Sequence, residues 1–330
     1  MRNLAKKAVL RGGLLRLVAG FRGPGAAILM YHSVMEDMRC QNDLLGGIIH
    51  SRAAFREQIE LLARQYNLIS LDQVKRFVLG EEELPDRAVV VTFDDGYADN
   101  CDIAAPLLNE AGVPATFYVT VDCVEQGKLP WPARLRFAFR TTKKGSWSDA
   151  SRRAWPLHDH AERERAYLFS CDECCKLAGE AQENYVGSLE HELDARVPID
   201  SGALMMNYDQ LRALVRQGHF VGSHTLTHPN LAQVSLNDAR REMTGSKERL
   251  EQQLGGAVTH FSYPCPALSP HWTEQTAAES RNAGYETAVT TDGGLVRKGD
   301  NPLWLRRVRP TKTLEGLLWN LECAFAGRAV

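Results

Sequence analysis

The chain has 330 residues, of which 44% are apolar and 24% are charged. This is the composition of an ordinary globular protein, and it excludes disorder over most of the length. The 39 Lys and Arg residues nearly balance the 41 Asp and Glu residues, which leaves a formal net charge of -2. A nucleic-acid-binding protein carries an excess of basic residues, so we expect no nucleic-acid partner. The sequence contains no run of 18 apolar residues and predicts no transmembrane helix.

Residues 1–25 form a basic amphipathic N-terminal segment, in which Leu and Val residues fall near helical spacing with Lys and Arg between them. Arg11 and Arg16 interrupt the apolar run that a signal peptide would need. Two interpretations stay open, a helix on an anionic membrane surface and a helix packed on the domain. We therefore expect a cytoplasmic protein, with or without peripheral contact at the inner membrane.

Strand and helix patterns alternate along most of the remaining chain. Short apolar runs predict buried strands at residues 26–31, 87–93, 114–121, 220–222, 259–263 and 287–290. Helical spacing, often closed by a glycine, predicts helices at residues 51–66, 102–111, 208–216, 237–254 and 273–282. Repeated strand–loop–helix units predict an α/β fold of the (β/α) barrel type, in which chemistry lies where the strands end.

Residues 128–203 break this alternation, because they are polar and rich in Arg and Glu. We interpret them as a mostly helical insertion in one domain that spans residues 26–330. The insertion contains Cys171, Cys174 and Cys175 in a CxxCC pattern. No second pair of Cys or His residues completes a four-ligand zinc site, so reduced thiols are the favoured interpretation.

Polar residues follow four of the predicted strands, and in a barrel these positions converge on one face. They are His32, the pair Asp94 and Asp95, the pair His224 and His228, and the turn Tyr263-Pro264-Cys265. Two histidines four residues apart lie on one side of a helical turn, and with one carboxylate they make a metal site that leaves positions open for water. One aspartate of the pair can ligate while the other serves as a base. A simple Asp-Asp-Gly turn is the alternative interpretation.

Two segments carry a family resemblance. VTFDDGYADN (91–100) and GSHTLTHPNL (222–231) strongly resemble motifs of the polysaccharide deacetylases, the NodB-homology carbohydrate esterases of family 4. The resemblance covers residues 26–310 apart from the insertion, and it implies a distorted (β/α) barrel. It also implies Asp94 as the catalytic base, and Asp95, His224 and His228 as ligands of a divalent metal ion, with zinc expected.

Three further roles are implied by the resemblance. ILMYHSV (28–34) resembles the N-terminal motif of the permuted branch, which includes poly-N-acetylglucosamine deacetylases. No histidine follows His271, and the resemblance implies His32 as the general acid. The family's Arg-x-Pro-Tyr motif corresponds to SYPC (262–265), which lacks the arginine that orients the base. WLRRV (304–308) resembles a late arginine motif, which implies Arg307 as its substitute, and the family pattern implies the backbone N–H of Cys265 as oxyanion donor.

The function that the resemblance implies is metal-dependent removal of N-acetyl groups from amino sugars of a polysaccharide or a lipid-linked glycan. An N-acetylated glycan is therefore the expected partner. An O-acetyl esterase acting on a glycan is one alternative, because it shares all the machinery. A catalytically inactive glycan-binding module is another, which the degraded third motif favours and the intact aspartates and histidines oppose.

Overall fold

A parallel sheet forms the centre of the molecule. The computed structural model describes residues 14–20, 22–36, 48–197 and 204–328. Within them an eight-stranded sheet has seven strands in one path, and β4 (Asn67–Leu68) pairs with one of these at the side. The path runs β1 (Ala26–Tyr31), β5 (Ala88–Phe93), β6 (Ala115–Val119), β9 (Phe220–Ser223), β10 (His260–Ser262), β11 (Thr287–Gly293) and β12 (Leu305–Arg307).

The two edges of this sheet nearly meet. Val308, directly after β12, bridges Leu29 of β1 in parallel. The Met30 N–H donates to the Val308 carbonyl at 3.2 Å, and the Val308 N–H donates to the Ile28 carbonyl at 2.7 Å. This contact makes the sheet a nearly closed barrel and confirms the predicted (β/α) barrel class.

The strands form because their side chains are apolar on both faces. All six residues of β1 and all six of β5 are buried. Ala27 and Leu29 belong to the large core beneath the surrounding helices, whereas Ile28 and Val90 belong to a second cluster with Tyr118, Val289 and Leu305. Because side chains alternate along a strand, Thr92 and Asp94 follow Val90 on the face of this second cluster.

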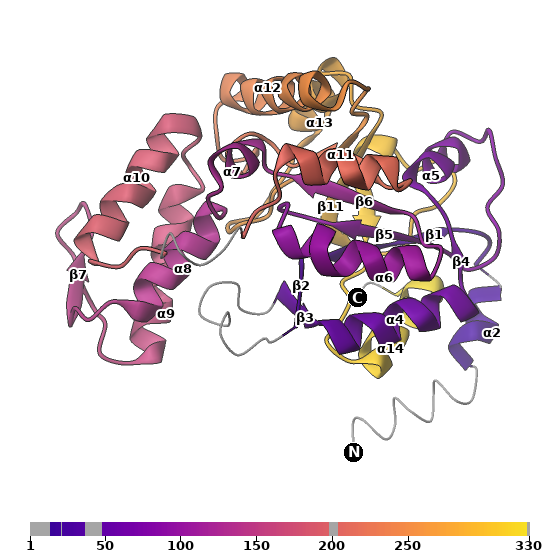
Figure 1. The fold of residues 1–330 in the computed structure, drawn as a ribbon, viewed down its shortest axis with the longest axis horizontal. Coiled ribbons are helices and arrows are strands. Elements are labelled where there is room, and N and C mark those ends of the chain that lie inside the picture. The colour runs from indigo at the N-terminus through magenta and orange to yellow at the C-terminus, as the bar shows by residue number, and fades with distance from the viewer. Residues whose placement is uncertain (1–13, 21, 37–47, 198–203, 329–330) are drawn as a thin grey trace.

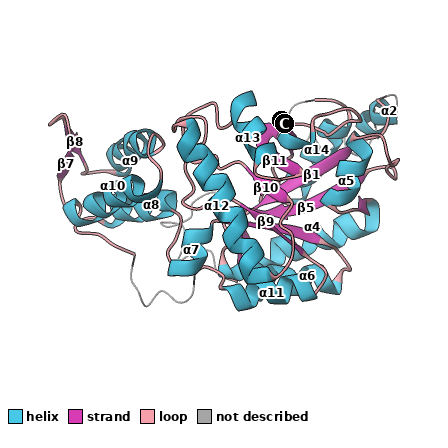
Figure 2. Cartoon of the chain, turned by 90° about the horizontal axis from the view of Figure 1, so that it is seen from above, coloured by secondary structure: helices cyan, strands magenta, loops and turns pink. Residues whose placement is uncertain are grey.

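Helices surround the barrel, as Figures 1 and 2 show. They are α4 (Arg52–Gln65), α5 (Leu71–Val78), α6 (Ala105–Glu110), α7 (Val121–Gln126), α11 (Tyr208–Arg216), α12 (Leu236–Leu254), α13 (Glu274–Asn282) and α14 (Leu314–Phe325). Ser51 caps α4 by accepting from the Ala54 N–H at 3.2 Å. Short connections add β2 (Ser33–Met35) paired with β3 (Ile49–Ser51), a π-helical turn at Asn100–Ala104 and a 3-10 turn at Pro302–Trp304.

The segment between β6 and β9 contains a second group of elements beside the barrel (Figure 1). They are α8 (Trp131–Thr141), β7 (Ser146–Ser148), β8 (Ala154–Pro156), α9 (His160–Cys174) and α10 (Gly179–Glu192). We call residues 128–197 the helical lobe. The lobe has its own core, in which Cys171, Cys174 and Cys175 pack with aromatic and aliphatic side chains. Burial raises the pKa of the Cys171 and Cys174 thiols, so these side chains behave as small apolar groups.

Part of the N-terminal segment lies outside the described residues. Helix α2 (Leu14–Gly20) belongs to the predicted basic amphipathic segment, whereas residues 1–13 and 21 are not described. Leu15 of α2 packs with Cys323 and Ala326 near the end of the chain. Among the helices that the structure describes, none is long and apolar enough to cross a membrane.

Candidate active site

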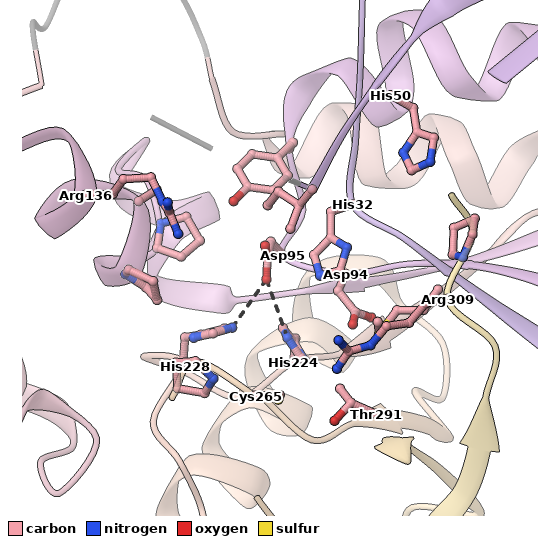
Figure 3. Close-up of a pocket in the computed structure, with 18 of the residues that line it drawn as sticks. His32, His50, Asp94, Asp95, Arg136, His224, His228, Cys265, Thr291 and Arg309 are labelled. Atoms are coloured by element: carbon pink, nitrogen blue, oxygen red, sulfur yellow. Dashed lines mark ion pairs between the residues drawn. The ribbon is translucent and has the colours of Figure 1, made fainter. Parts of the chain in front are cut away.

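The carboxyl ends of the barrel strands surround a cavity of about 420 Å³. His32 follows β1, Asp94 and Asp95 follow β5, and His224 follows β9. Figure 3 shows these side chains gathered around one pocket, together with His228 and Cys265. The parallel strand order explains this arrangement, because parallel strands end at the same edge of a sheet.

Asp95, His224 and His228 form a compact triad. The Asp95 Oδ1 atom lies 3.5 Å from His224 Nε2 and 3.3 Å from His228 Nε2. All three side chains are buried, and one ligand atom from each lies within 4.8 Å of the others. Among the described residues this is the one group of three His, Cys, Asp or Glu side chains with such spacing, so the cysteines of the lobe do not form a second one.

The loop that carries the two histidines is not a helical turn, and that prediction is wrong. Residues 224–230 have no helical segment, and Thr225 and His228 have positive φ angles of 69° and 65°. Glu242 of α12 determines the loop shape, because its carboxylate accepts from the Leu226 and Thr227 N–H groups at 2.9 Å each. The left-handed backbone conformations of Thr225 and His228 place both imidazoles on the same side of the loop without a helix.

The triad fits a divalent metal ion. His224 Nδ1 lies 2.8 Å from the Ser262 carbonyl oxygen, to which it can only donate, and this leaves the Nε2 lone pair facing Asp95. Burial lowers the pKa of His224 to about 4, against the opposing effect of Asp94, so the ring is neutral at pH 7. Two imidazole nitrogens and one carboxylate are a common ligand set for catalytic zinc.

Asp94 is held by an arginine from the other end of the sheet. The Arg307 guanidinium donates to both carboxylate oxygens of Asp94, at 2.8 Å each. Both side chains are buried, and Ser262 donates to Asp94 Oδ1 at 3.2 Å. Burial alone would raise the pKa of Asp94, but Arg307 and His224 overcome this effect and lower it. The carboxylate therefore stays ionised and fixed in orientation.

His32 lies beside both aspartates in the cavity (Figure 3). Its backbone is held from the segment that follows Asp94 and Asp95. The Asn100 amide donates to the His32 carbonyl at 2.6 Å. Asp99 accepts from the Val34 N–H at 3.1 Å and from the Ser33 hydroxyl at 2.6 Å. The segment 94–100 thus carries the two aspartates and also fixes the loop of His32.

Cys265 also lines the cavity. Its sulfur lies 2.8 Å from His271 Nε2, and burial raises the pKa of its thiol. The same hydrogen bond engages His271, the last histidine of the chain.

Several cavity residues are absent from the sequence predictions. His50 of β3 and Thr291 of β11 lie in the wall of the cavity, as do Arg136 and Tyr167 of the lobe and Arg309 after β12. His50 Nε2 lies 3.3 Å from the Thr311 carbonyl, and burial lowers the pKa of His50 to about 4. The sequence offers a signal for Arg309, which lies two residues beyond Arg307 and so extends from the same strand toward the cavity. No local sequence pattern places the other four residues at the cavity.

Comparison with known proteins identifies the family. The profile described as Polysaccharide deacetylase matches residues 81–153 and 184–288, which is more than half of the chain. YxkH of Bacillus subtilis, which carries the name of a polysaccharide deacetylase, is 19% identical over 290 residues, 88% of this chain and 72% of YxkH.

Solved structures show the same fold. The Streptococcus pyogenes deacetylase PplD in complex with acetate superposes with a TM-score of 0.61 and 19% identity, over 90% of this chain and 98% of PplD. IcaB from Ammonifex degensii superposes with a TM-score of 0.59 and 19% identity, over 91% of this chain and 97% of IcaB. These structures show the shared fold, and the family profile, which matches more than half of the chain, shows that the chain belongs to the polysaccharide deacetylase family.

Proposed function

We propose that this protein is a metal-dependent hydrolase that removes N-acetyl groups from amino sugars of a polysaccharide or a lipid-linked glycan. The observation that carries the proposal is the buried triad of Asp95, His224 and His228 in a cavity that also contains Asp94 and His32. A divalent ion bound by the triad, with zinc the expected one, supplies Lewis acidity that acidifies water and polarises a carbonyl oxygen.

The proposed base is Asp94. Its carboxylate lies next to the triad, and the Arg307 pair keeps it ionised and oriented. An ionised carboxylate held in place can accept the proton of the attacking water. Arg307 is thus proposed to act through Asp94, as the substitute for the arginine missing from the third motif.

The proposed acid is His32, and its role rests on the permuted-branch motif around it. Cleavage of an amide needs a proton on the leaving nitrogen, because an amide anion is too basic to depart. His32 lines the same cavity as the aspartates and is partly exposed to it. The backbone N–H of Cys265 is the proposed donor to the oxyanion of the tetrahedral intermediate.

Two further proposals concern the chain as a whole. We propose one deacetylase domain at residues 26–330 that contains residues 128–203 as an insertion. We also propose a cytoplasmic location, with two alternatives for residues 1–25: peripheral contact at the inner membrane, which the basic residues between Leu and Val at helical spacing favour, and packing on the domain, which the contact of Leu15 with Cys323 favours.

The test is acetate release from matched substrates. The protein is incubated with an N-acetylated chitooligosaccharide and with an O-acetylated sugar, each with zinc and after treatment with a chelator. We expect metal-dependent release of acetate from the N-acetylated substrate. Release from the O-acetylated sugar alone would make the protein an esterase, and binding of the glycan without any release would make it a binding module.

A further inference from the structure

Two arginines line the cavity from different parts of the chain. Arg136 belongs to α8 of the helical lobe, and Arg309 follows β12 of the barrel. In Figure 3 the segments that carry them lie on opposite sides of the Asp95, His224 and His228 triad. Among the described residues, neither guanidinium has a carboxylate within 4.0 Å. The arginine ion pairs near the cavity are made instead by Arg134, Arg140 and Arg307.

The lack of a carboxylate partner is unusual for this part of the molecule. Arg134, two residues before Arg136 on α8, pairs with both Glu183 and Glu190. Arg140, one turn after Arg136, pairs with Glu164 at 3.6 Å. Of the three arginines in this helix, the one that lines the cavity has no carboxylate partner among the residues that the structure describes.

Arg136 is nevertheless held in place. Its Nη2 atom donates to the Tyr167 hydroxyl at 3.2 Å, and its guanidinium carbon lies 4.8 Å from the centre of the Tyr167 ring. This contact positions the side chain without neutralising its charge. A guanidinium that is positioned but not neutralised is suited to binding an anion with little loss of conformational entropy.

The carboxylates of the cavity cannot serve as partners for these arginines, because both are already engaged. Asp94 is neutralised by Arg307 through two hydrogen bonds of 2.8 Å. Asp95 faces the two histidines of the triad. Among the described residues that line the cavity, the remaining fixed charges are those of Arg136 and Arg309, and both are positive.

We infer that this cavity binds glycans that carry anionic groups, phosphate or carboxylate, on the units that flank the acetylated amino sugar, and that Arg136 and Arg309 bind those groups. The inference rests on the proposed function and narrows its substrate class. The positions of the arginines on opposite sides of the triad match a chain with negative charge on either side of the sugar to be deacetylated. A neutral chitin-type chain would leave both guanidinium groups without a counter-charge.

The test compares three substrates that differ in charge. Chitotetraose is neutral, a hyaluronan tetrasaccharide has a glucuronate beside each N-acetylglucosamine, and an N-acetylglucosamine oligomer joined by phosphodiesters carries phosphate. The kcat/KM for acetate release is measured with the zinc-loaded protein, and the Kd for each oligosaccharide with the metal-free protein. The second measurement excludes anion binding to the metal.

We expect at least one anionic substrate to exceed chitotetraose by tenfold or more in both measurements. Arg136→Gln and Arg309→Gln should each reduce this ratio about tenfold, since a hydrogen bond to a charged group contributes at least that much. The exposed Arg306, which does not line the cavity, provides the matched control Arg306→Gln, which should keep the ratio.

The preference of the wild-type protein for anionic substrates should also fall as the salt concentration is raised, and this measurement tests the inference even if a variant does not fold. A carboxylate or a phosphate preference supports the inference equally and identifies the anion.

Equal kcat/KM and Kd for the neutral and anionic chains would overturn the inference while leaving the deacetylase proposal intact. An anion preference that survives both substitutions would overturn the assignment to these arginines. If no substrate releases acetate, the deacetylase proposal fails, and the Kd values of the metal-free protein still decide whether the cavity selects anionic glycans.

Discussion

The barrel and the helical lobe contribute different chemistry to the same cavity. On the barrel side, polar side chains lie in fixed positions: Asp94 is hydrogen-bonded to Arg307 and Ser262, and the Asp95 Oδ1 atom lies 3.5 Å and 3.3 Å from Nε2 of His224 and His228. On the lobe side, the wall consists of Pro130, Pro132, Ala133, Tyr167 and the unneutralised Arg136. Reacting groups need fixed positions, which buried networks provide, whereas groups that contact the rest of a substrate need only a suitable surface.

The two regions are joined by hydrogen bonds to the loop that carries His228 and to the loop that contains Ala267. The Trp131 indole of α8 donates to the His228 carbonyl at 2.9 Å, and the Cys175 thiol donates to the Ala267 carbonyl at 3.3 Å. Both hydrogen bonds attach the lobe to backbone carbonyl groups of loops beside the cavity. This difference implies that substitutions in the barrel network change the chemical step, and that substitutions in the lobe change stability or substrate choice.

The largest expected effect is that of His224→Ala. Loss of one ligand from a three-residue site should remove the metal after dialysis and abolish acetate release. Metal content by mass spectrometry and turnover are measured on the same preparation. His191→Ala, an exposed histidine of the lobe, is the control that keeps both. Full metal content in the His224 variant, or metal retained by the lobe cysteines, would place the site elsewhere.

Asp94→Asn should separate base from ligand. The variant is expected to keep its metal and to lose about 10²–10⁴-fold in turnover, the usual contribution of a general base. Asp95→Asn is the matched control, and it should lose metal first because Asp95 lies closest to both histidines. If Asp94→Asn is instead the variant that loses metal, the roles of the two aspartates are exchanged.

His32→Ala tests the proposed acid by comparing two leaving groups. An amide needs protonation of its nitrogen, whereas a phenolate leaves readily without it. The variant should therefore lose about 10²-fold or more on an N-acetylated sugar and much less on an activated phenyl acetate, with its metal retained. His50→Ala is the control from the same cavity, because His50 contacts the Thr311 carbonyl and not the aspartates. Equal losses on both substrates would indicate that His32 only positions other groups.

Local sequence patterns were sufficient for most of the barrel and for the centre of the site. The apolar run at Ala26–Tyr31 and the helical spacing at Tyr208–Arg216 have the predicted bounds in the structure. Because parallel strands end at the same edge of a sheet, their sequence positions predict that His32, Asp94, His224 and Cys265 lie near one another, and all four line one cavity. These features are predictable because burial on both faces of a strand, or on one stripe of a helix, is recorded in the residues themselves.

Features that depend on distant contacts were not predictable in the same way. The histidine loop takes its shape from Glu242, and Arg136 reaches the cavity because the lobe packs beside it. The predicted helix at residues 102–111 begins instead with a π-helical turn at Asn100–Ala104, in which Asn100 bonds to the His32 carbonyl. Helix α5 was missed although a local signal existed, since Ser70 and Gln73 form a capping box.

A substitution inside the lobe should lower the stability of the protein without changing its metal content. Arg134→Met would leave Glu190 buried without its partner, and removal of one member of a buried ion pair costs about 3–5 kcal/mol. We expect faster hydrogen exchange in α8 and α10 and a lower free energy of unfolding, with metal content unchanged. Arg165→Met, at an exposed position of α9, is the control. Loss of metal in the Arg134 variant would show that the lobe and the metal site form one cooperative unit.

The smallest expected effect concerns Asp99, which holds the loop of His32. Burial raises its pKa from 3.8 to about 7, against the hydrogen bonds from Ser33 and Val34. Between about pH 4 and pH 7 the folded protein therefore keeps a proton that the unfolded chain has released, so folding stability falls as the pH rises through this window. Asp99→Asn cannot ionise and lacks this fall, while its amide oxygen can still accept from the Val34 N–H.

The free energy of unfolding of the metal-free Asp99→Asn variant, relative to wild type, should thus increase by about 1–3 kcal/mol between pH 4.5 and pH 7.5. Urea unfolding at several pH values measures the difference directly, and Asp86→Asn, at an exposed position, controls for the loss of a surface charge. Parallel curves for wild type and Asp99→Asn would mean that Asp99 is ionised in the folded protein throughout. In that case the loop of His32 would be held by a charged carboxylate, and lowering the pH through the window would not strengthen it.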